Sequence, residues 1–146
     1  MSKERIIYGC FEHVSLPELG IFNTLAKIDT GAYSGALHCS RIREYVRKSD
    51  GKKVLSFTPS EKNKHKIEAT NYRKAYVRSS TGHRVKRYLF DTKIVIKNEE
   101  YQIRIGLSDR SDMNCEILIG KRFLRENNVI VDVCINQEFD TDGGKK

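Results

Sequence analysis

The chain has 146 residues, of which 38% are hydrophobic and 32% charged, a size and composition that fit one globular domain. No apolar run reaches the roughly 18 residues of a membrane-spanning helix. Residues 1–8 lack the apolar stretch of a secretory signal, so we expect a cytoplasmic protein without membrane contact. The four cysteines form no Cys-x-x-Cys pair, which predicts reduced and mostly buried thiols.

Strand patterns dominate the chain, and each is short. An apolar run that ends at Asp29 predicts a buried strand, and the basic residues 41–71 predict an insertion or loop. Alternating residues then predict two hairpins that turn at 80–82 and at 98–100. The remaining predicted elements are strands over 117–119 and 129–131, a short helix over 121–126 and a flexible tail over 138–146. This pattern favours an all-β barrel or sandwich built from residues 1–137.

The net charge of +8 is concentrated in the middle of the chain. From residue 41 to residue 88 there are 15 Lys and Arg against four Asp and Glu. Such a region attracts nucleic acid or an acidic partner, but a solvated lysine-rich surface has the same composition. Because no RNP-like aromatic motif, helix-turn-helix pattern or zinc-finger spacing accompanies the charge, nucleic-acid binding is the weaker interpretation.

One segment, Ala26-Lys-Ile-Asp29-Thr30-Gly31-Ala32, has the composition of a catalytic loop. The apolar strand delivers the Asp29 carboxylate to a tight loop, and Gly31 lets a backbone N–H approach that carboxylate closely. Thr30 can add a hydroxyl to hold the loop, and Ala32 leaves space beside it. Later in the chain, Ile117-Leu-Ile119-Gly120 is an apolar strand that runs into a glycine.

These two motifs, in this order, resemble those of the retropepsin-type aspartic peptidases. A longer resemblance covers nearly the whole chain and is to the bacterial family called ATP-dependent zinc proteases, whose fold is similar to one lobe of an acid protease. The motifs that carry it are Val14-Ser-Leu-Pro-Glu-Leu-Gly20, Ala26 to Ala32, Ala36-Leu-His38, Val77-Arg-Ser-Ser80 with Gly82-His83, and Leu107-Ser-Asp-Arg110 with Met113. The resemblance implies an all-β, single-lobe, retropepsin-like closed barrel with one short helix near the C-terminus.

The resemblance also implies an aspartic endopeptidase. Its chemistry needs two carboxylates about 3 Å apart that share one proton. The chain has one Asp-Thr-Gly, because Asp140-Thr-Asp-Gly143 lies in the tail and lacks the spacing. We therefore expect a homodimer in which each subunit contributes Asp29. The resemblance implies the catalytic residues Asp29, Thr30 and Gly31, and the substrate-binding residues Ala32, Ser80, Thr81, Gly82, Ile119 and Gly120, with Ser80 to Gly82 at the tip of a flap.

The residues do not support the zinc and ATP dependence in that family name. The chain has no His-Glu-x-x-His motif, Walker A loop or glycine-rich phosphate cradle. Cys10 and His13 have a ligand-like spacing, but His38 and Cys39 are adjacent and would point to opposite faces of a strand. We expect no metal and no cofactor. The alternative function is a non-catalytic peptide- or protein-binding module of the same fold, for which the resemblance suggests an ATP-grasp ligase as partner.

The sequence departs from the retropepsin pattern at the loop supports. Retropepsins usually have Arg directly after the apolar-apolar-Gly motif, where this chain has Lys121 followed by Arg122. Lys cannot reproduce the bidentate fork of Arg, so this pattern leaves the bracing of the catalytic loop open. Tyr33 follows Ala32 in place of an acidic residue, and Ser34-Gly35 precede Ala36-Leu-His38 in place of Thr-Ser.

Overall fold

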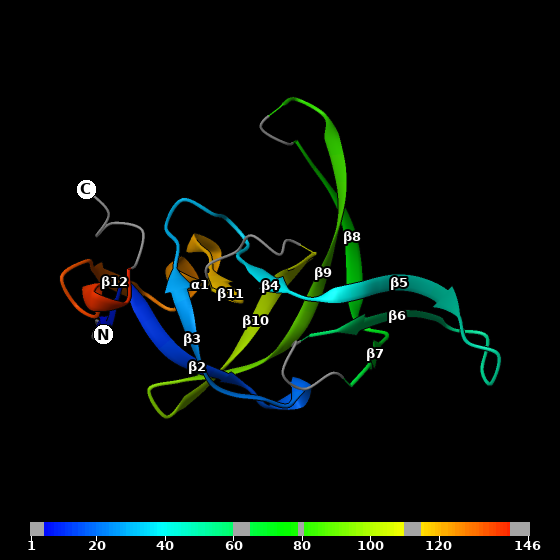
Figure 1. The fold of residues 1–146 in the computed structure, drawn as a ribbon, viewed down its shortest axis with the longest axis horizontal. Helices are drawn as coiled ribbons and strands as arrows, with labels where there is room; N and C mark the ends of the chain where they lie inside the picture. Colours follow the sequence, from blue (N-terminus) through cyan, green and yellow to red (C-terminus); the bar gives the residue numbers. More distant parts are fainter. Residues whose placement is uncertain (1–4, 60–64, 79–80, 110–114, 141–146) are drawn as a thin grey trace.

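A computed structural model describes residues 5–59, 65–78, 81–109 and 115–140 (Figure 1). It consists mainly of strands, with one short α-helix and two 3₁₀ turns. The elements are, in order, β1 (Ile6–Gly9), β2 (Phe11–Leu16), η1 (Pro17–Leu19), β3 (Ile21–Ile28), β4 (Ala36–His38), β5 (Ser40–Val46), β6 (Lys53–Thr58), β7 (Ile67–Ala69), β8 (Tyr72–Arg78), β9 (Arg84–Ile96), β10 (Glu99–Ser108), β11 (Ile117–Ile119), α1 (Lys121–Glu126), β12 (Val129–Asp132) and η2 (Gln137–Phe139). None of the helices in the described ranges is long and apolar enough to cross a membrane.

Six strands close into a barrel in the order β10–β4–β11–β3–β2–β9, because β9 and β10 also pair with each other. The all-β, closed-barrel prediction and the short helix over 121–126 are thus confirmed. Alternate residues of the strands face inward, so that Ile94, Ile96 and Ile105 have no exposed surface. Beyond the barrel, β9 continues and pairs with β8 to form a projecting hairpin, the flap hairpin (Figure 1).

The connection around β11 determines where the candidate site forms. β11 lies between β3, to which it is parallel, and β4, to which it is antiparallel. The chain therefore leaves the sheet after β3, returns as β4, and later inserts β11 between the two strands. The loop that joins β3 to β4 lies over the end of β11, because Ile28 and Ile119 are register partners.

A small sheet in the order β5–β6–β7 lies where the sequence patterns predicted an insertion or loop over 41–71. Its middle strand, β6, is buried at every position from Val54 to Thr58. Leu55 and Phe57 join the hydrophobic core, and the Phe57 ring packs edge-on against Phe90 of β9 at 5.4 Å. Apolar residues between the lysines therefore make this insertion an extension of the barrel core.

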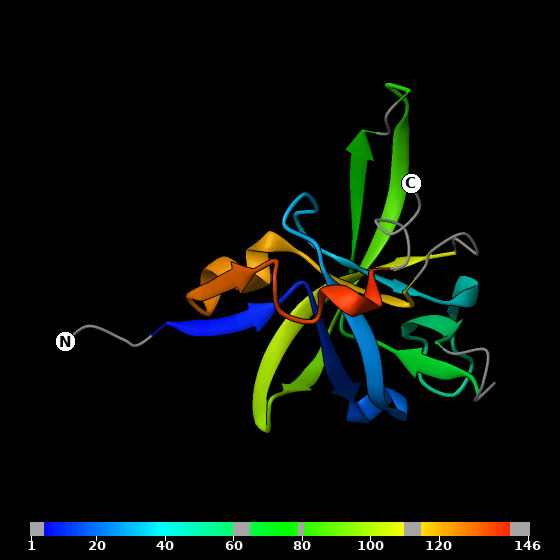
Figure 2. The ribbon, with the colours of Figure 1, turned by 60° about the vertical axis from the view of Figure 1, so that its left-hand side comes forward.

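The two ends of the described chain pair with each other, since β1 and β12 form a two-stranded parallel sheet. Figure 2 shows this sheet at the side of the barrel, with the last described turn close to β2 and β3. Of the predicted tail over 138–146, the first residues belong to the η2 region, where the Phe139 ring packs edge-on against Phe11 and His13. Residues 141–146 lie outside the described residues.

Candidate active site

Asp29 lies directly after β3, at the point where β3 and β11 end together. Its backbone N–H donates to the Ile119 carbonyl over 2.8 Å, which joins the loop to β11. The Asp29 carboxylate accepts a 3.0 Å hydrogen bond at Oδ1 from the Gly31 N–H. Asp29 is half-buried, whereas Thr30 and Gly31 are exposed. The loop thus fixes one carboxylate oxygen, and Oδ2 has no hydrogen-bond partner among the described residues.

Backbone groups at the start of α1 hold the next part of the loop. The Lys121 N–H donates to the Ala32 carbonyl over 2.8 Å, and the Arg122 N–H donates to the Tyr33 carbonyl over 2.9 Å. The Arg122 guanidinium instead pairs with Glu126, one turn further along α1, at 3.3 Å. This bracing does not depend on the side chain at position 121, so the Lys in place of Arg leaves the loop supported.

Two glycines allow the loop and β11 to lie in direct contact. At Gly120, a Cβ would lie 2.4 Å from the Gly35 nitrogen and 2.5 Å from the Tyr33 carbonyl oxygen. At Gly35, which has a φ of +76°, a Cβ would lie 2.3 Å from the Leu118 carbonyl oxygen. Only glycine fits at either position. Gly120 and Ile119 are buried in the subunit, where they support the loop, and their contact with substrate stays a prediction.

A second support reaches the end of β3 from the segments that follow β1 and β12. The Ile135 carbonyl accepts the Cys10 N–H at 3.0 Å, and the Cys10 carbonyl accepts the Ile28 N–H at 2.9 Å. Two peptide hydrogen bonds therefore connect the C-terminal segment to the residue that precedes Asp29.

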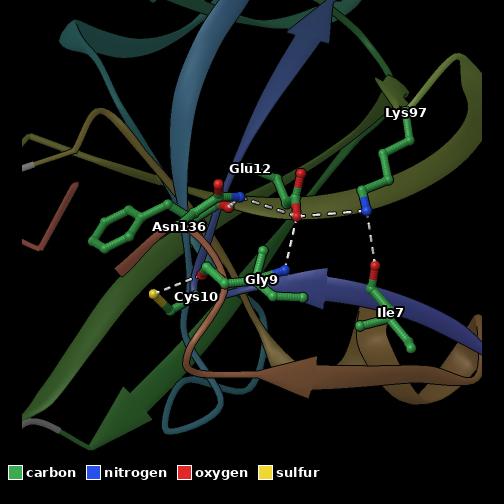
Figure 3. A network of polar contacts seen from close by, with 8 residues as sticks. Ile7, Gly9, Cys10, Glu12, Lys97 and Asn136 are labelled. Carbon is green, nitrogen blue, oxygen red and sulfur yellow. Dashed lines mark hydrogen bonds and ion pairs between the residues drawn. The ribbon is translucent and has the colours of Figure 1, made fainter. Parts of the chain in front are cut away.

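Glu12 fastens this region to the barrel (Figure 3). Its buried carboxylate accepts the Gly9 N–H at 2.7 Å, and the side-chain nitrogens of Asn136 and Lys97 lie at 3.5 and 3.9 Å. Lys97 also donates to the Ile7 carbonyl over 3.0 Å. A single acidic residue in a strand has no distinctive sequence pattern, and the sequence reasoning therefore missed Glu12.

The predicted flap residues lie away from the loop in the sequence but at the same end of the molecule. The flap hairpin and the β3–β4 loop project from that end in both views (Figures 1 and 2). Gly82 is exposed near the hairpin tip with a φ of +88°, beside the exposed Thr81. Ser80 lies outside the described residues.

The inserted sheet holds the base of this hairpin through Glu44 of β5. The Glu44 carboxylate pairs with Lys74 of β8 at 2.7 Å and accepts a hydrogen bond from the Tyr72 hydroxyl. The hydrogen bond from Lys74, and then that from Tyr72, lowers the pKa of Glu44 below its ordinary value. Burial, together with the hydrogen bond to Glu44, raises the pKa of Tyr72 to about 12. Sequence reasoning did not identify this contact because it joins residues 28 positions apart.

The described residues contain no group of three His, Cys, Asp or Glu side chains placed to hold a metal ion. His13 packs against Phe139, and the Cys10 thiol donates to the Ile135 carbonyl at 3.3 Å. His38 is buried on β4, where its backbone N–H donates to the Glu116 carbonyl. Burial raises the pKa of the Cys39 thiol to about 12 and keeps it protonated.

Comparison with known proteins gives two groups of relatives. Proteins named "Probable alpha-L-glutamate ligase" match at 25% identity over 97% of this chain in Shewanella halifaxensis, and at 29% over 88% in Parasynechococcus marenigrum. The chain spans about a third of their length, 32% and 28% respectively. The crystal structure of Lpg0085, a Legionella pneumophila protein of unknown function, matches with a TM-score of 0.72 and 26% identity, over 90% of this chain and 96% of that one.

The comparison also identifies the family. Its profile matches residues 7–138 and carries the description "Retropepsin-like aspartic endopeptidase RimB". The match includes the Asp29 loop, β11 and the flap hairpin. The chain belongs to the RimB-like family of retropepsin-like proteins.

Proposed function

We propose that this chain is an aspartic endopeptidase whose catalytic pair consists of the Asp29 carboxylates of two subunits. The Asp29 loop is the observation that carries the proposal. The half-buried Asp29 carboxylate lies at the end of two parallel strands and accepts one backbone N–H. The loop backbone around it is held by the Asp29 N–H, which donates to the Ile119 carbonyl of β11, and by N–H groups of α1, which donate to the next two loop carbonyls. Fixed carboxylates of this kind lose little energy to reorganisation when charge moves during the reaction.

In the proposed reaction, the two carboxylates share one proton, because like charges at about 3 Å cannot both ionise readily. The ionised carboxylate takes a proton from water, and the water oxygen attacks the carbonyl carbon of the peptide. The protonated carboxyl group gives its proton to the carbonyl oxygen. The C–N bond then breaks as the nitrogen takes a proton from one carboxyl group and a hydroxyl group of the tetrahedral intermediate gives its proton to the other carboxylate. This yields a carboxylic acid and an amine and restores the single shared proton of the pair.

The β1–β12 sheet is an argument that the other carboxylate comes from a second copy of this chain. Ile7 and Ile130 are register partners on β1 and β12 and are 48% and 41% exposed, and Val133 is 69% exposed. Two of these side chains lie on the β1–β12 sheet and Val133 lies in the turn that directly follows β12, and association with another copy would cover them. A two-fold axis beside this sheet would place the same residues against each other.

The substrate in this proposal is a peptide or protein that contains glutamate. The relatives named as alpha-L-glutamate ligases contain a region similar to nearly the whole of this chain. A peptidase of this family could therefore act on the bonds that such a ligase forms. The excess of Lys and Arg from residue 41 to residue 88 favours acidic peptides.

The second candidate is a non-catalytic module that binds a peptide or a ligase partner. The observation that favours it is the same similarity to one part of longer proteins named as ligases. Both candidates use the same fold, and hydrolysis distinguishes between them.

The test is cleavage of a peptide mixture that includes glutamate-rich peptides, between about pH 4 and pH 7, with products identified by mass spectrometry. Asp29→Asn preserves the size of the side chain and its capacity to accept the Gly31 N–H, but removes both ionisable groups of the pair. General acid–base assistance is worth about 10²–10⁴-fold, so we expect a loss of at least about 100-fold. Asp50→Asn, the same chemical change in the exposed β5–β6 turn, should retain activity.

Thermal melts confirm that each variant is folded. Undiminished cleavage by folded Asp29→Asn contradicts the peptidase proposal. If the wild type cleaves nothing under any condition, the binding module is favoured, especially if Asp29→Asn melts at a higher temperature because carboxylate repulsion is relieved.

A further inference from the structure

The inserted sheet has a cavity that the proposed hydrolysis does not use. Its volume is about 440 Å³, and its described lining consists of Arg41, Ile42, Arg43, Ser56 and Lys66. β5 contributes the first three residues, β6 contributes Ser56, and Lys66 directly precedes β7. We call it the β5–β7 cavity. Three of these five side chains are cationic, and none is a carboxylate.

The backbone of β5 is irregular at this cavity. The pairing of β5 with β6 shifts register between Ser40 and Arg43, and Arg41 has a φ of +54°. A bulge interrupts the alternation of a strand, which is why the consecutive residues Arg41, Ile42 and Arg43 all line one cavity. A non-glycine residue in the left-handed region costs energy, and such residues are concentrated at functional sites.

The three cations are only weakly neutralised by carboxylates. Lys66 Nζ lies 3.8 Å from Glu68, but their side chains are 58% and 33% exposed, so that this ion pair is weak. The Arg43 guanidinium lies 5.2 Å from the centre of the Tyr45 ring, which orients it and leaves its N–H groups available. Arg41 has no ion pair within the described part of the chain. The cavity therefore combines a mainly apolar lining with three cationic side chains that are available to an anionic ligand.

The cavity is connected to the candidate active site by one short strand. β4 leads from the Asp29 loop to Cys39, and β5 follows at Ser40. Arg41 lies six positions after Gly35, a path of at most about 20 Å for extended chain. An extended polypeptide of about six or more residues can span that distance.

We propose that the β5–β7 cavity is an exosite that binds the carboxylates of an acidic polypeptide segment outside the catalytic cleft. The inference that this segment belongs to a substrate rests on the proposed function. Guanidinium groups bind carboxylates through paired hydrogen bonds, and two arginines on one edge of the cavity provide two such forks. Single-stranded nucleic acid is bound on aromatic stacking platforms, and the described lining contains no aromatic ring.

The test measures binding in the full chain carrying Asp29→Asn, so that no peptide is cut. A fluorescein-labelled peptide of about ten glutamates is titrated in about 100 mM salt, and fluorescence anisotropy reports binding. Arg41→Gln with Arg43→Gln should weaken binding at least tenfold. Lys48→Gln with Lys52→Gln removes the same charge from the β5–β6 turn of the same insertion and should change binding less than twofold. If the first pair unfolds the protein, Arg43→Gln with Lys66→Gln replaces it.

Equal weakening by the two pairs would overturn the proposal, because the attraction would then come from net charge alone. Absence of binding to the Asp29→Asn protein also overturns it. Tighter, cavity-dependent binding of a labelled oligothymidine would assign the cavity to nucleic acid instead. The readout does not depend on hydrolysis, so failure of the peptidase proposal leaves cavity binding intact. Conversely, cleavage of short peptides without exosite binding contradicts only the exosite.

Discussion

At the scale of single residues, the position of Asp29 depends on backbone contacts more than on side chains. The loop carbonyls of Ala32 and Tyr33 accept N–H groups from α1, and Gly120 lies directly under them. Side chains at the start of α1 can therefore vary without moving the loop. The glycines beneath the loop, Gly35 and Gly120, cannot be replaced without moving it, because the atoms that they contact belong to the backbone.

We expect Gly120→Ala to destabilise the protein. The new Cβ would lie 2.4 Å from the Gly35 nitrogen, an approach that only a shift of the loop relieves. Overpacking of this kind typically costs about 1–3 kcal/mol of unfolding free energy. Urea denaturation measures the cost. Gly51→Ala is the control, since nothing lies within 4 Å of its Cβ position and its cost is confined to the strain of a φ of +72°. An equal or smaller loss for Gly120→Ala would contradict the close contact.

The sequence predicted some of these residues and not others, for physical reasons. Asp29, Gly31 and Gly120 belong to short motifs whose chemistry can be stated from neighbouring residues. Gly35 could not be assigned, because its role depends on β11, which is more than 80 residues away. Glu12 was missed for the same reason, since its partners Asn136 and Lys97 come from distant parts of the chain.

At the scale of elements, the inserted sheet and the flap hairpin form one connected unit. Phe57 of β6 packs on Phe90, and Glu44 of β5 holds Lys74 and Tyr72 of β8. The hairpin that would close over a substrate is thus anchored to the sheet that carries the β5–β7 cavity. Glu44 directly follows Arg43, so the strand that lines the cavity also holds the hairpin.

We expect the Glu44 contact to stabilise the fold in its ionised form. The folded-state pKa of Glu44 is lowered, so this stability is present above the unfolded pKa of about 4.3 and is lost as pH falls through the folded value. The melting temperature of the wild type should exceed that of Glu44→Gln at pH 7, and the difference should shrink as the pH falls below about 4.3. Thermal melts across this range measure it.

Glu100→Gln is the matched control for this measurement. Glu100 is 60% exposed and lies 3.9 Å from Lys93, and exposed pairs of this kind contribute little to stability. Its melting temperature should stay close to that of the wild type throughout. A Glu44→Gln difference that is unchanged from pH 7 to pH 3 would show that the charge is not responsible.

Alternation and turn residues predicted the hairpins and the helix, because these elements are local. β6 was not predicted as a strand, because its apolar residues stand between lysines in a segment that is polar as a whole. Its residue Phe57 packs on Phe90 of β9, a contact between distant parts of the chain. The closed barrel came from the family resemblance, but the order of its strands was not predicted. β11 pairs with strands some 80 and 90 residues earlier, and no local pattern encodes such pairing.

At the scale of the whole molecule, the two ends of the described chain are connected by hydrogen bonds to the strand that leads to Asp29. The β1–β12 sheet carries the exposed Ile7 and Ile130, and Glu12 and Cys10 connect it to the strand that ends at Asp29 (Figure 3). In the proposed dimer, docking of a second subunit on this sheet would therefore bear directly on the position of the Asp29 carboxylate.

We expect specific activity to fall upon dilution through the dimer dissociation constant, because each subunit supplies only one carboxylate. Val133→Asp places a charge on the proposed interface. It should move the midpoint of the dilution curve, the protein concentration at which half of the specific activity is lost, at least tenfold higher. Phe22→Asp, at a residue that is 65% exposed on β3, should leave the midpoint unchanged. Activity assays with sedimentation velocity measure both. Constant specific activity in a species that sediments as a monomer would contradict the shared pair.

The flap hairpin has a consequence for solubility as well as for catalysis. β8 is the last strand of the seven-stranded order, so one of its sides has no paired strand in the described part of the molecule. Exposed strand edges are templates for aggregation, and charged side chains are a common protection. Arg73 places positive charge along this edge, whereas Lys74 is paired with Glu44. Repulsion between the Arg73 side chains of different molecules should keep their hairpins apart, and concentrated salt or polyanions would weaken that protection.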